Sequence, residues 1–201
     1  AALRDVGTLS VLDVKRGDIG STMVGYAQAY LSDGAPLAAD SITVSPYLGY
    51  GSLTPALDLA EASGRGIFVL ALTSNPEGAT VQHAIRGDQA VAAGVVEGVT
   101  ASNAPASGEG RLGSIGLVVG ATVGEAVSHL EIDLLHANGP LLAPGVGAQG
   151  AGPAELESVF GAARRHVLAS TSRGVLKAGP SIEALRTAAL AATHEAATAL
   201  R

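Results

Sequence analysis

The chain has 201 residues, of which 47% are hydrophobic, and this is enough to build one sizeable core. It contains no cysteine, which excludes disulfides and thiolate metal sites within the chain. Its formal net charge of −6 argues against general nucleic-acid binding, and no apolar run reaches the length of a membrane-spanning helix.

Strand-like and helix-like stretches alternate along the whole chain. Apolar runs bounded by turn residues predict strands, and apolar residues spaced three or four apart predict helices. In chain order we expect a buried strand at 8–12, a helix at 21–32, a strand at 39–44, a helix at 53–63, a strand at 66–72, helical stretches at 78–83 and 88–101, a polar loop at 103–113, a strand at 114–119, a helix at 123–130, a strand at 140–143, a helix at 154–163, a strand at 166–170, a turn through Arg173 and a last helix at 181–200.

This order amounts to six β units, nearly all of them a strand followed by a helix. Apolar strands with helical crossovers indicate an α/β fold whose parallel sheet is covered on both faces. An open doubly wound sheet and a (β/α) barrel both fit the pattern. The turns that carry polar residues all follow strands, and in a barrel such turns converge on one face, so we favour the barrel. Six units are two fewer than a complete barrel needs.

Three ionisable residues follow the first predicted strand. Residues two apart on a strand point to the same side, so Asp13 and Lys15 are expected to project together from its end, while Asp18 lies past Gly17 in the turn. Charges at such a place are costly unless they are paired, and loops of this kind often carry function. A solvated ion cluster is the alternative interpretation.

Three further polar residues also follow predicted strands. Arg173 follows the last strand, where barrels often bind phosphate, and a guanidinium can bind phosphate through two hydrogen bonds. Gln149 belongs to a glycine-rich loop that could fold over a ligand, and Ser74, at the end of a buried strand, could form a hydrogen bond with a ligand. The alternatives are a surface arginine, an ordinary loop residue and a turn or N-cap serine. The five histidines show no metal-ligand spacing.

Taken together, these turns resemble the orotidine 5′-phosphate decarboxylases, and most closely their actinobacterial-type subgroup. The resemblance rests on five segments in the family's order and spacing: 13–22, 45–49, 73–78, 144–150 and 172–174. It implies a (β/α)8 TIM barrel of which this chain carries about six units, strands 3 to 8. We accordingly expect one barrel domain over residues 1–201 that lacks the family's first two units.

The same resemblance implies a reaction and a set of roles. The reaction is decarboxylation of orotidine 5′-phosphate to UMP in pyrimidine biosynthesis, in the cytoplasm, without cofactor or metal. Lys15 would donate the proton, Asp13 would hold Lys15, and Asp18 and Thr22 would reach across a homodimer interface into the neighbour's site. No nucleic-acid or membrane partner is expected. The substrate-binding residues would be Ile19, Thr22, Ser74, Pro144, Gln149 and Arg173.

Two alternatives remain beside this interpretation. Related sugar-phosphate decarboxylases and synthases on the same barrel also carry the Asp-x-Lys-x-x-Asp pattern and use it to bind Mg²⁺. The chain could instead be an inactive fragment, or a subunit that works only when it is joined to the missing units. The Pro144–Gly150 loop with Gln149 favours the pyrimidine enzyme over the first alternative.

Overall fold

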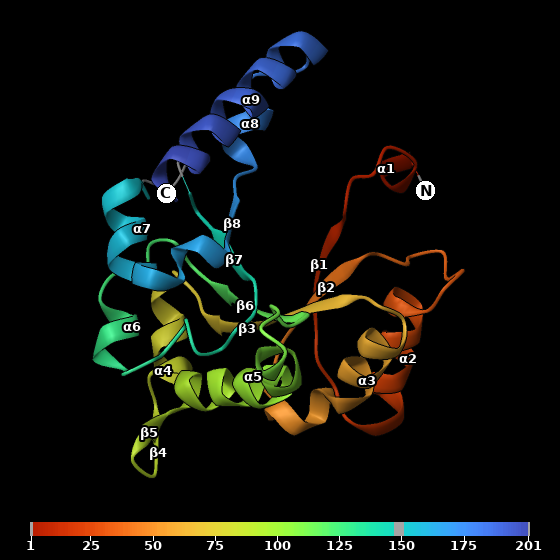
Figure 1. Cartoon of the computed structure of the whole chain (residues 1–201), viewed down its shortest axis with the longest axis vertical. Helices are drawn as coiled ribbons and strands as arrows, with labels where there is room; N and C mark the ends of the chain where they lie inside the picture. Colours follow the sequence, from red (N-terminus) through yellow and green to blue (C-terminus); the bar gives the residue numbers. More distant parts are fainter. Residues whose placement is uncertain (1, 147–150, 201) are drawn as a thin grey trace. The chain divides into compact units, whose positions relative to one another are not determined.

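The computed structural model describes residues 2–146 and 151–200 (Figure 1). Its main sheet has the strand order β1-β2-β3-β6-β7-β8, and β1–β2, β2–β3 and β7–β8 pair in parallel. Each strand of this sheet is therefore the neighbour of the next one along the chain. A doubly wound sheet would reverse its order at a switch point, so the sequential order confirms the barrel type of winding. The strands span Val11–Arg16, Ser41–Val44, Gly66–Leu72, Ile115–Val119, Leu141–Pro144 and Val167–Ser170.

The chain divides into two compact units. Unit 1 comprises Ala1–Leu70, Val95–Leu117 and Ala137–Pro140, and unit 2 comprises Ala71–Gly94, Val118–His136 and Leu141–Arg201. The helices of unit 1 are α1 (Ala2–Asp5), α2 (Gly20–Leu31), the 3-10 helix η1 (Tyr50–Leu53), α3 (Thr54–Ala62) and most of α5 (Val91–Gly108).

Mostly aliphatic side chains, both large and small, build the core of unit 1. Helix α2, which confirms the helix expected at 21–32, buries Met23, Ala27 and Leu31 at four-residue spacing, the period that keeps side chains on one helix face. Helix α3 lies beside α2 and buries Ala56 and Ala60 (Figure 1). The expected strand at 66–72 is β3, with its bounds unchanged.

Strand β1 differs from the prediction in both extent and burial. It spans Val11–Arg16 instead of 8–12, so Asp13 and Lys15 lie within the strand and not after it. Its side chains are largely exposed, because β1 pairs with β2 along one edge and has no strand on its other edge in the described part of the chain. The expectation of a buried strand was therefore wrong.

Asp40 fixes the start of β1 against β2. Its carboxylate accepts hydrogen bonds from the backbone N–H of Ser10 (2.8 Å) and from the Ser10 hydroxyl (2.7 Å), and Arg4 pairs with it at 2.9 Å. The hydrogen bonds from Ser10, with a smaller contribution from Arg4, lower the pKa of Asp40 to about 2. Asp40 therefore stays ionised over the whole range in which proteins normally work.

A buried asparagine extends helix α5 beyond its expected end. The polar stretch expected as a loop at 103–113 is helical as far as Gly108. The side chain of Asn103, which is 2% exposed, donates to the carbonyls of Ile115 (2.7 Å) and Ala137 (2.8 Å) and accepts from the Ile115 N–H (3.3 Å). These contacts come from residues 12 and 34 positions away, so no local pattern predicts them.

Unit 2 departs from the prediction in three places. A β4–β5 hairpin (Ile85–Arg86 and Gln89–Ala90) separates the two helical stretches, and Gly87 turns it with φ +72°. The helix expected at 123–130 is reduced to one turn, α6 (Ala126–His129), and Arg173 begins a short helix, α8 (Arg173–Leu176). The other elements are η2 (Pro76–Gly78), α4 (Ala79–Gln82), α7 (Pro153–Phe160), η3 (Gly161–His166) and α9 (Ile182–Ala199).

Helix α9 confirms the expected last helix and its cap. The hydroxyl of Ser181 accepts a hydrogen bond from the backbone N–H of Ala184 at 3.4 Å. Among the described residues, no helix combines the length and the hydropathy that crossing a membrane requires.

Candidate functional site

The conspicuous irregularity of unit 1 is a bulge in β1. Leu12 pairs with Ile42 and Arg16 pairs with Val44, so three residues of β1, Asp13 to Lys15, stand against the single residue Thr43 of β2. A bulge interrupts the ladder of backbone hydrogen bonds and redirects side chains, and bulges are over-represented next to active sites. Here the Thr43 hydroxyl takes over part of the lost pairing, because it accepts a hydrogen bond from the backbone N–H of Lys15 at 3.0 Å.

The bulge brings Asp13 and Lys15 together, as the sequence predicted. The ammonium Nζ of Lys15 donates to Asp13 Oδ2, and the hydroxyl of Thr43 donates to Asp13 Oδ1 at 2.7 Å. Partial burial raises the pKa of Asp13, but the hydrogen bonds from Lys15 and Thr43 and the charge of Lys15 outweigh it, so this pKa lies below its usual value. Asp13 is therefore a carboxylate near neutral pH, as a partner of an ammonium group must be.

The ion pair alone does not hold Lys15 in place. The side chains of Lys15 and Asp13 are 52% and 58% exposed, and an exposed pair contributes about 0–1 kcal/mol. Fixing a lysine side chain costs about 2 kcal/mol of rotamer entropy. Lys15 also has φ +46°, a left-handed conformation that costs about 1–2 kcal/mol in a residue with a Cβ. Strain of this kind, in a residue paired to an acid, is typical of a functional site.

A close approach of two backbones fixes the end of β1. The N–H of Ser45 donates to the carbonyl of Arg16 at 2.7 Å. At Gly17 a Cβ would collide with the carbonyl oxygen of Ser45 and lie 3.2 Å from its carbonyl carbon. The guanidinium of Arg16 lies over the ring of Tyr26 in α2, 5.4 Å from its centre. The turn that follows Lys15 is thus held against both β2 and α2.

The remaining predicted residues of unit 1 lie at the start of α2. Asp18 Oδ1 accepts a hydrogen bond from the backbone N–H of Ile19 at 2.8 Å. Ile19 is the N-cap position of α2 and is exposed, and Thr22 is exposed in its first turn. These three residues follow the Asp13–Lys15 pair directly in the chain and have no described contact with it.

In unit 2, Ser74 lies in a hydrogen-bonded loop after β3. The side-chain amide of Gln82 bonds Thr73 twice, accepting from its N–H (2.9 Å) and donating to its hydroxyl (2.7 Å). The Thr73 hydroxyl in turn donates to Asn75 at 2.7 Å. The hydroxyl of Ser74 is exposed and has no hydrogen-bond partner among the described residues, so it is available to a ligand.

The other predicted ligand-binding residues also belong to unit 2. Pro144 ends β7, and its carbonyl accepts from the N–H of Ala121 at 2.9 Å. Arg173 is the first residue of α8 and its side chain is exposed. Gln149 lies outside the described residues. In the described part of the chain, no group of three or more His, Asp or Glu residues could hold a metal ion.

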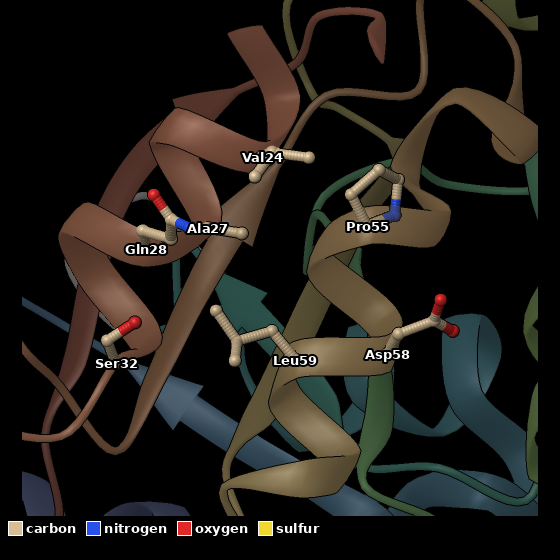
Figure 2. Close-up of a pocket in the computed structure, with 7 residues that line it drawn as sticks. All are labelled: Val24, Ala27, Gln28, Ser32, Pro55, Asp58 and Leu59. Carbon is tan, nitrogen blue, oxygen red and sulfur yellow. The ribbon is translucent and has the colours of Figure 1, made fainter. Parts of the chain in front are cut away.

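A groove between α2 and α3 lies apart from these residues. Figure 2 shows its lining: Val24, Ala27, Gln28, Ser32, Pro55, Asp58 and Leu59, around a volume of about 380 Å³. None of the seven side chains is basic, and none belongs to the Asp13–Lys15 pair or to the residues predicted beside it. The groove therefore lacks the charge that would bind a phosphate group.

Thr43, which is hydrogen-bonded to both Asp13 and Lys15, was not predicted from the sequence. Its signal in the sequence was weak: a single hydroxyl between the apolar residues Ile42 and Val44 of the strand expected at 39–44. A threonine in such a strand is usually explained by its strand propensity, because β-branched residues favour strands. Only the register of β1 against β2 shows that this hydroxyl faces the bulge.

Known proteins resemble this chain over most of its length. Residues 1–188 match the Orotidine 5′-phosphate decarboxylase / HUMPS family. The orotidine 5′-phosphate decarboxylase of Streptomyces coelicolor is 60% identical over 187 residues, which cover 92% of this chain and 65% of that protein. The chain thus spans about two thirds of the length of the curated relatives it matches.

Solved structures give the same result. A Streptomyces avermitilis crystal structure, provisionally assigned as an orotidine 5′-phosphate decarboxylase, is 57% identical with a TM-score of 0.90, and the match covers 98% of this chain and 67% of that one. The OMP decarboxylase of Leishmania donovani is 30% identical with a TM-score of 0.69, covering 95% of this chain and 68% of that one. The barrel-type sheet is therefore shared with structures of this family.

The close approach at Gly17 leads to a stability prediction. Gly17→Ala should lower the free energy of unfolding by about 1–3 kcal/mol, because the new methyl group forces Ser45 and the turn apart. Gly25→Ala is the matched control: it lies in α2 with nothing within 4 Å of the added Cβ, and should raise stability by about 0.5–1 kcal/mol. Urea unfolding of both variants measures the difference. Equal effects would show that the backbones at Gly17 are not in contact.

Proposed function

The chain belongs to the orotidine 5′-phosphate decarboxylase / HUMPS family, and we propose that the whole protein converts orotidine 5′-monophosphate to UMP in pyrimidine biosynthesis. The observation that carries this proposal is the pairing of Lys15 with Asp13 at a bulge, where a strained backbone presents an ammonium group. The identity of 60% to a decarboxylase of this name supports it.

The proposed chemistry depends on a cation beside C6 of the pyrimidine. The bond from C6 to the carboxylate breaks, CO2 leaves, and the electron pair stays on C6 as a carbanion in the plane of the ring. The ammonium of Lys15 stabilises this charge and then gives it a proton, which forms the C6–H bond of UMP. The neutral amine regains its proton from water. Asp13 holds the ammonium of Lys15 in place before the reaction.

The second part of the proposal concerns the nucleotide. Arg173 would bind the phosphate group, Gln149 would bridge phosphate and base, Ser74 would bond the polar edge of the pyrimidine, and Pro144 would contact the ligand. The exposure of Ser74 and Arg173 supports these assignments, because both side chains can reach a ligand without breaking a bond seen in the structure. Ile19 would contact the ligand from the start of α2.

The third part concerns the assembly. We propose a homodimer in which Asp18 and Thr22 of one subunit complete the site of the other. Asp18 precedes α2 and Thr22 lies in its first turn. Between them lies Ile19, which is 63% exposed. An exposed apolar residue between two polar ones suits a contact with a second copy. We also propose that the enzyme works in the cytoplasm, which the absence of cysteine fits.

The role of Lys15 is tested by separating chemistry from binding. In the whole protein, Lys15→Ala should lower kcat at least about a hundredfold, because the proton donor is lost, while the Kd of UMP stays within a few-fold. Lys177→Ala removes an exposed lysine of the C-cap of α8 and is the control. Turnover of the Lys15 variant within tenfold of wild type would refute the assignment. Activity should persist in EDTA if no metal takes part.

The role of Arg173 is tested with two ligands that differ only in the phosphate. Arg173→Ala should weaken UMP binding by about 2–4 kcal/mol, the range for losing a charge-assisted contact, and leave uridine binding nearly unchanged. Arg186→Ala, an exposed arginine of α9, should alter neither. Calorimetric titration measures both ligands. A similar loss for UMP and uridine would argue against a phosphate role.

The shared site is tested by mixing two inactive variants. If Asp18 serves the partner's site, a mixed dimer of Lys15→Ala and Asp18→Ala subunits has one site with both residues and one with neither. A one-to-one mixture contains about half mixed dimers, so about a quarter of the wild-type activity should return after subunit exchange. Native mass spectrometry confirms the exchange. No recovery in exchanged dimers would place both residues in the same subunit's site.

A further inference from the structure

Thr43 links both ends of Lys15 in one ring of hydrogen bonds. The backbone N–H of Lys15 donates to the Thr43 hydroxyl (3.0 Å), that hydroxyl donates to Asp13 Oδ1 (2.7 Å), and Asp13 Oδ2 accepts from Lys15 Nζ. A backbone N–H can only donate, so the Thr43 oxygen must accept there. Its single proton is thereby directed to Asp13, and the second carboxylate oxygen is left for the ammonium.

Thr43 is the rigid member of this ring. It is 1% exposed, whereas Asp13 and Lys15 are more than half exposed. Ile42 and Val44 on either side are fully buried, and Thr43 is in register with Phe68 of β3. A β-branched side chain has few χ1 rotamers, so the hydroxyl has a fixed direction. The two exposed side chains are bonded to this buried group.

We propose that Thr43 is a positioning residue for the decarboxylation, which places the Lys15 ammonium by holding the bulge at the backbone of Lys15 and the carboxylate of Asp13 at once. The inference rests on the proposed role of Lys15 as proton donor. Thr43 itself touches no substrate in this account. Its effect on the reaction passes entirely through the geometry of Lys15 and Asp13.

Two substitutions at position 43 separate the hydroxyl from the shape of the side chain. Thr43→Val keeps the shape and removes both hydrogen bonds, whereas Thr43→Ser keeps the hydroxyl. In the whole protein, Thr43→Val should lower kcat about 10- to 100-fold, because a misplaced group near the reacting atom costs that much, with the Kd of UMP unchanged within threefold. Thr43→Ser, which keeps the hydroxyl, should have a kcat within threefold of wild type. Thr100→Val, which removes a hydroxyl bonded to the Val96 carbonyl in its own helix, should match wild type.

Amide hydrogen exchange supplies a readout that does not depend on activity. In Thr43→Val the Lys15 amide loses its acceptor and should exchange at least about tenfold faster, and Thr43→Ser should restore the protection. The Lys177 amide, which donates to the Arg173 carbonyl, is the internal reference. ¹⁵N-lysine labelling makes both amides visible by NMR.

The outcomes are distinct. Faster exchange at Lys15 with an unchanged kcat would overturn the positioning role, and unchanged exchange would overturn the hydrogen-bond ring itself. A parallel loss of UMP binding and kcat in Thr43→Val, not rescued by Thr43→Ser, would show a merely structural residue. No turnover by wild type, with exchange at Lys15 still dependent on Thr43, would refute the proposed function and leave the ring in place.

Discussion

An ammonium group can act on a bound ligand only if it is held in place, and in this chain the hydrogen bond from Thr43 to Asp13 orients the carboxylate that pairs with Lys15. Both ends of β1 are fixed, by the Ser10–Asp40 bonds at its start and by the bond between Ser45 and Arg16 at its end. The bulge lies between these two ties. Thr43 occupies the position of β2 opposite the bulged residues Asp13 to Lys15.

The exposure of the Lys15 and Asp13 side chains also has a chemical meaning. Two opposite charges in water attract each other weakly, and an exposed ammonium stabilises a carbanion little better than solvent does. The proposed reaction therefore needs water to be excluded when the nucleotide binds. A substrate that covers Lys15, together with a second subunit that contributes Asp18 and Thr22, would supply this exclusion. The chain provides the arrangement of Lys15 and Asp13, and the bound ligand and the partner subunit would lower the dielectric constant around them by excluding water.

The sequence predicted those parts of the fold and site that follow from local patterns. Helix α2, strand β3 and helix α9 were predicted from the spacing of apolar residues and, for α9, from the Ser181 cap. The pairing of Asp13 with Lys15 was predicted from their two-residue spacing. What it missed depends on contacts between distant residues. The bulge results from two ties that fix β1 at both ends, so the alternation rule applied to Asp13 and Lys15 gave the right pairing through the wrong local geometry. Thr43 was missed because its role exists only in that register.

Asn103 has a consequence for the order in which the chain folds. The amide ties three segments that are far apart in sequence: α5, the start of β6 and the residues before β7. The residues before it can form helix early, because helix growth needs only local bonds. The helical end after Asn103 has proline at position 105 and little local support, so it becomes stable only when β6 and Ala137 have arrived. Helix α5 is therefore continuous in the folded chain, whereas the stability of its C-terminal part depends on β6 and on the residues before β7.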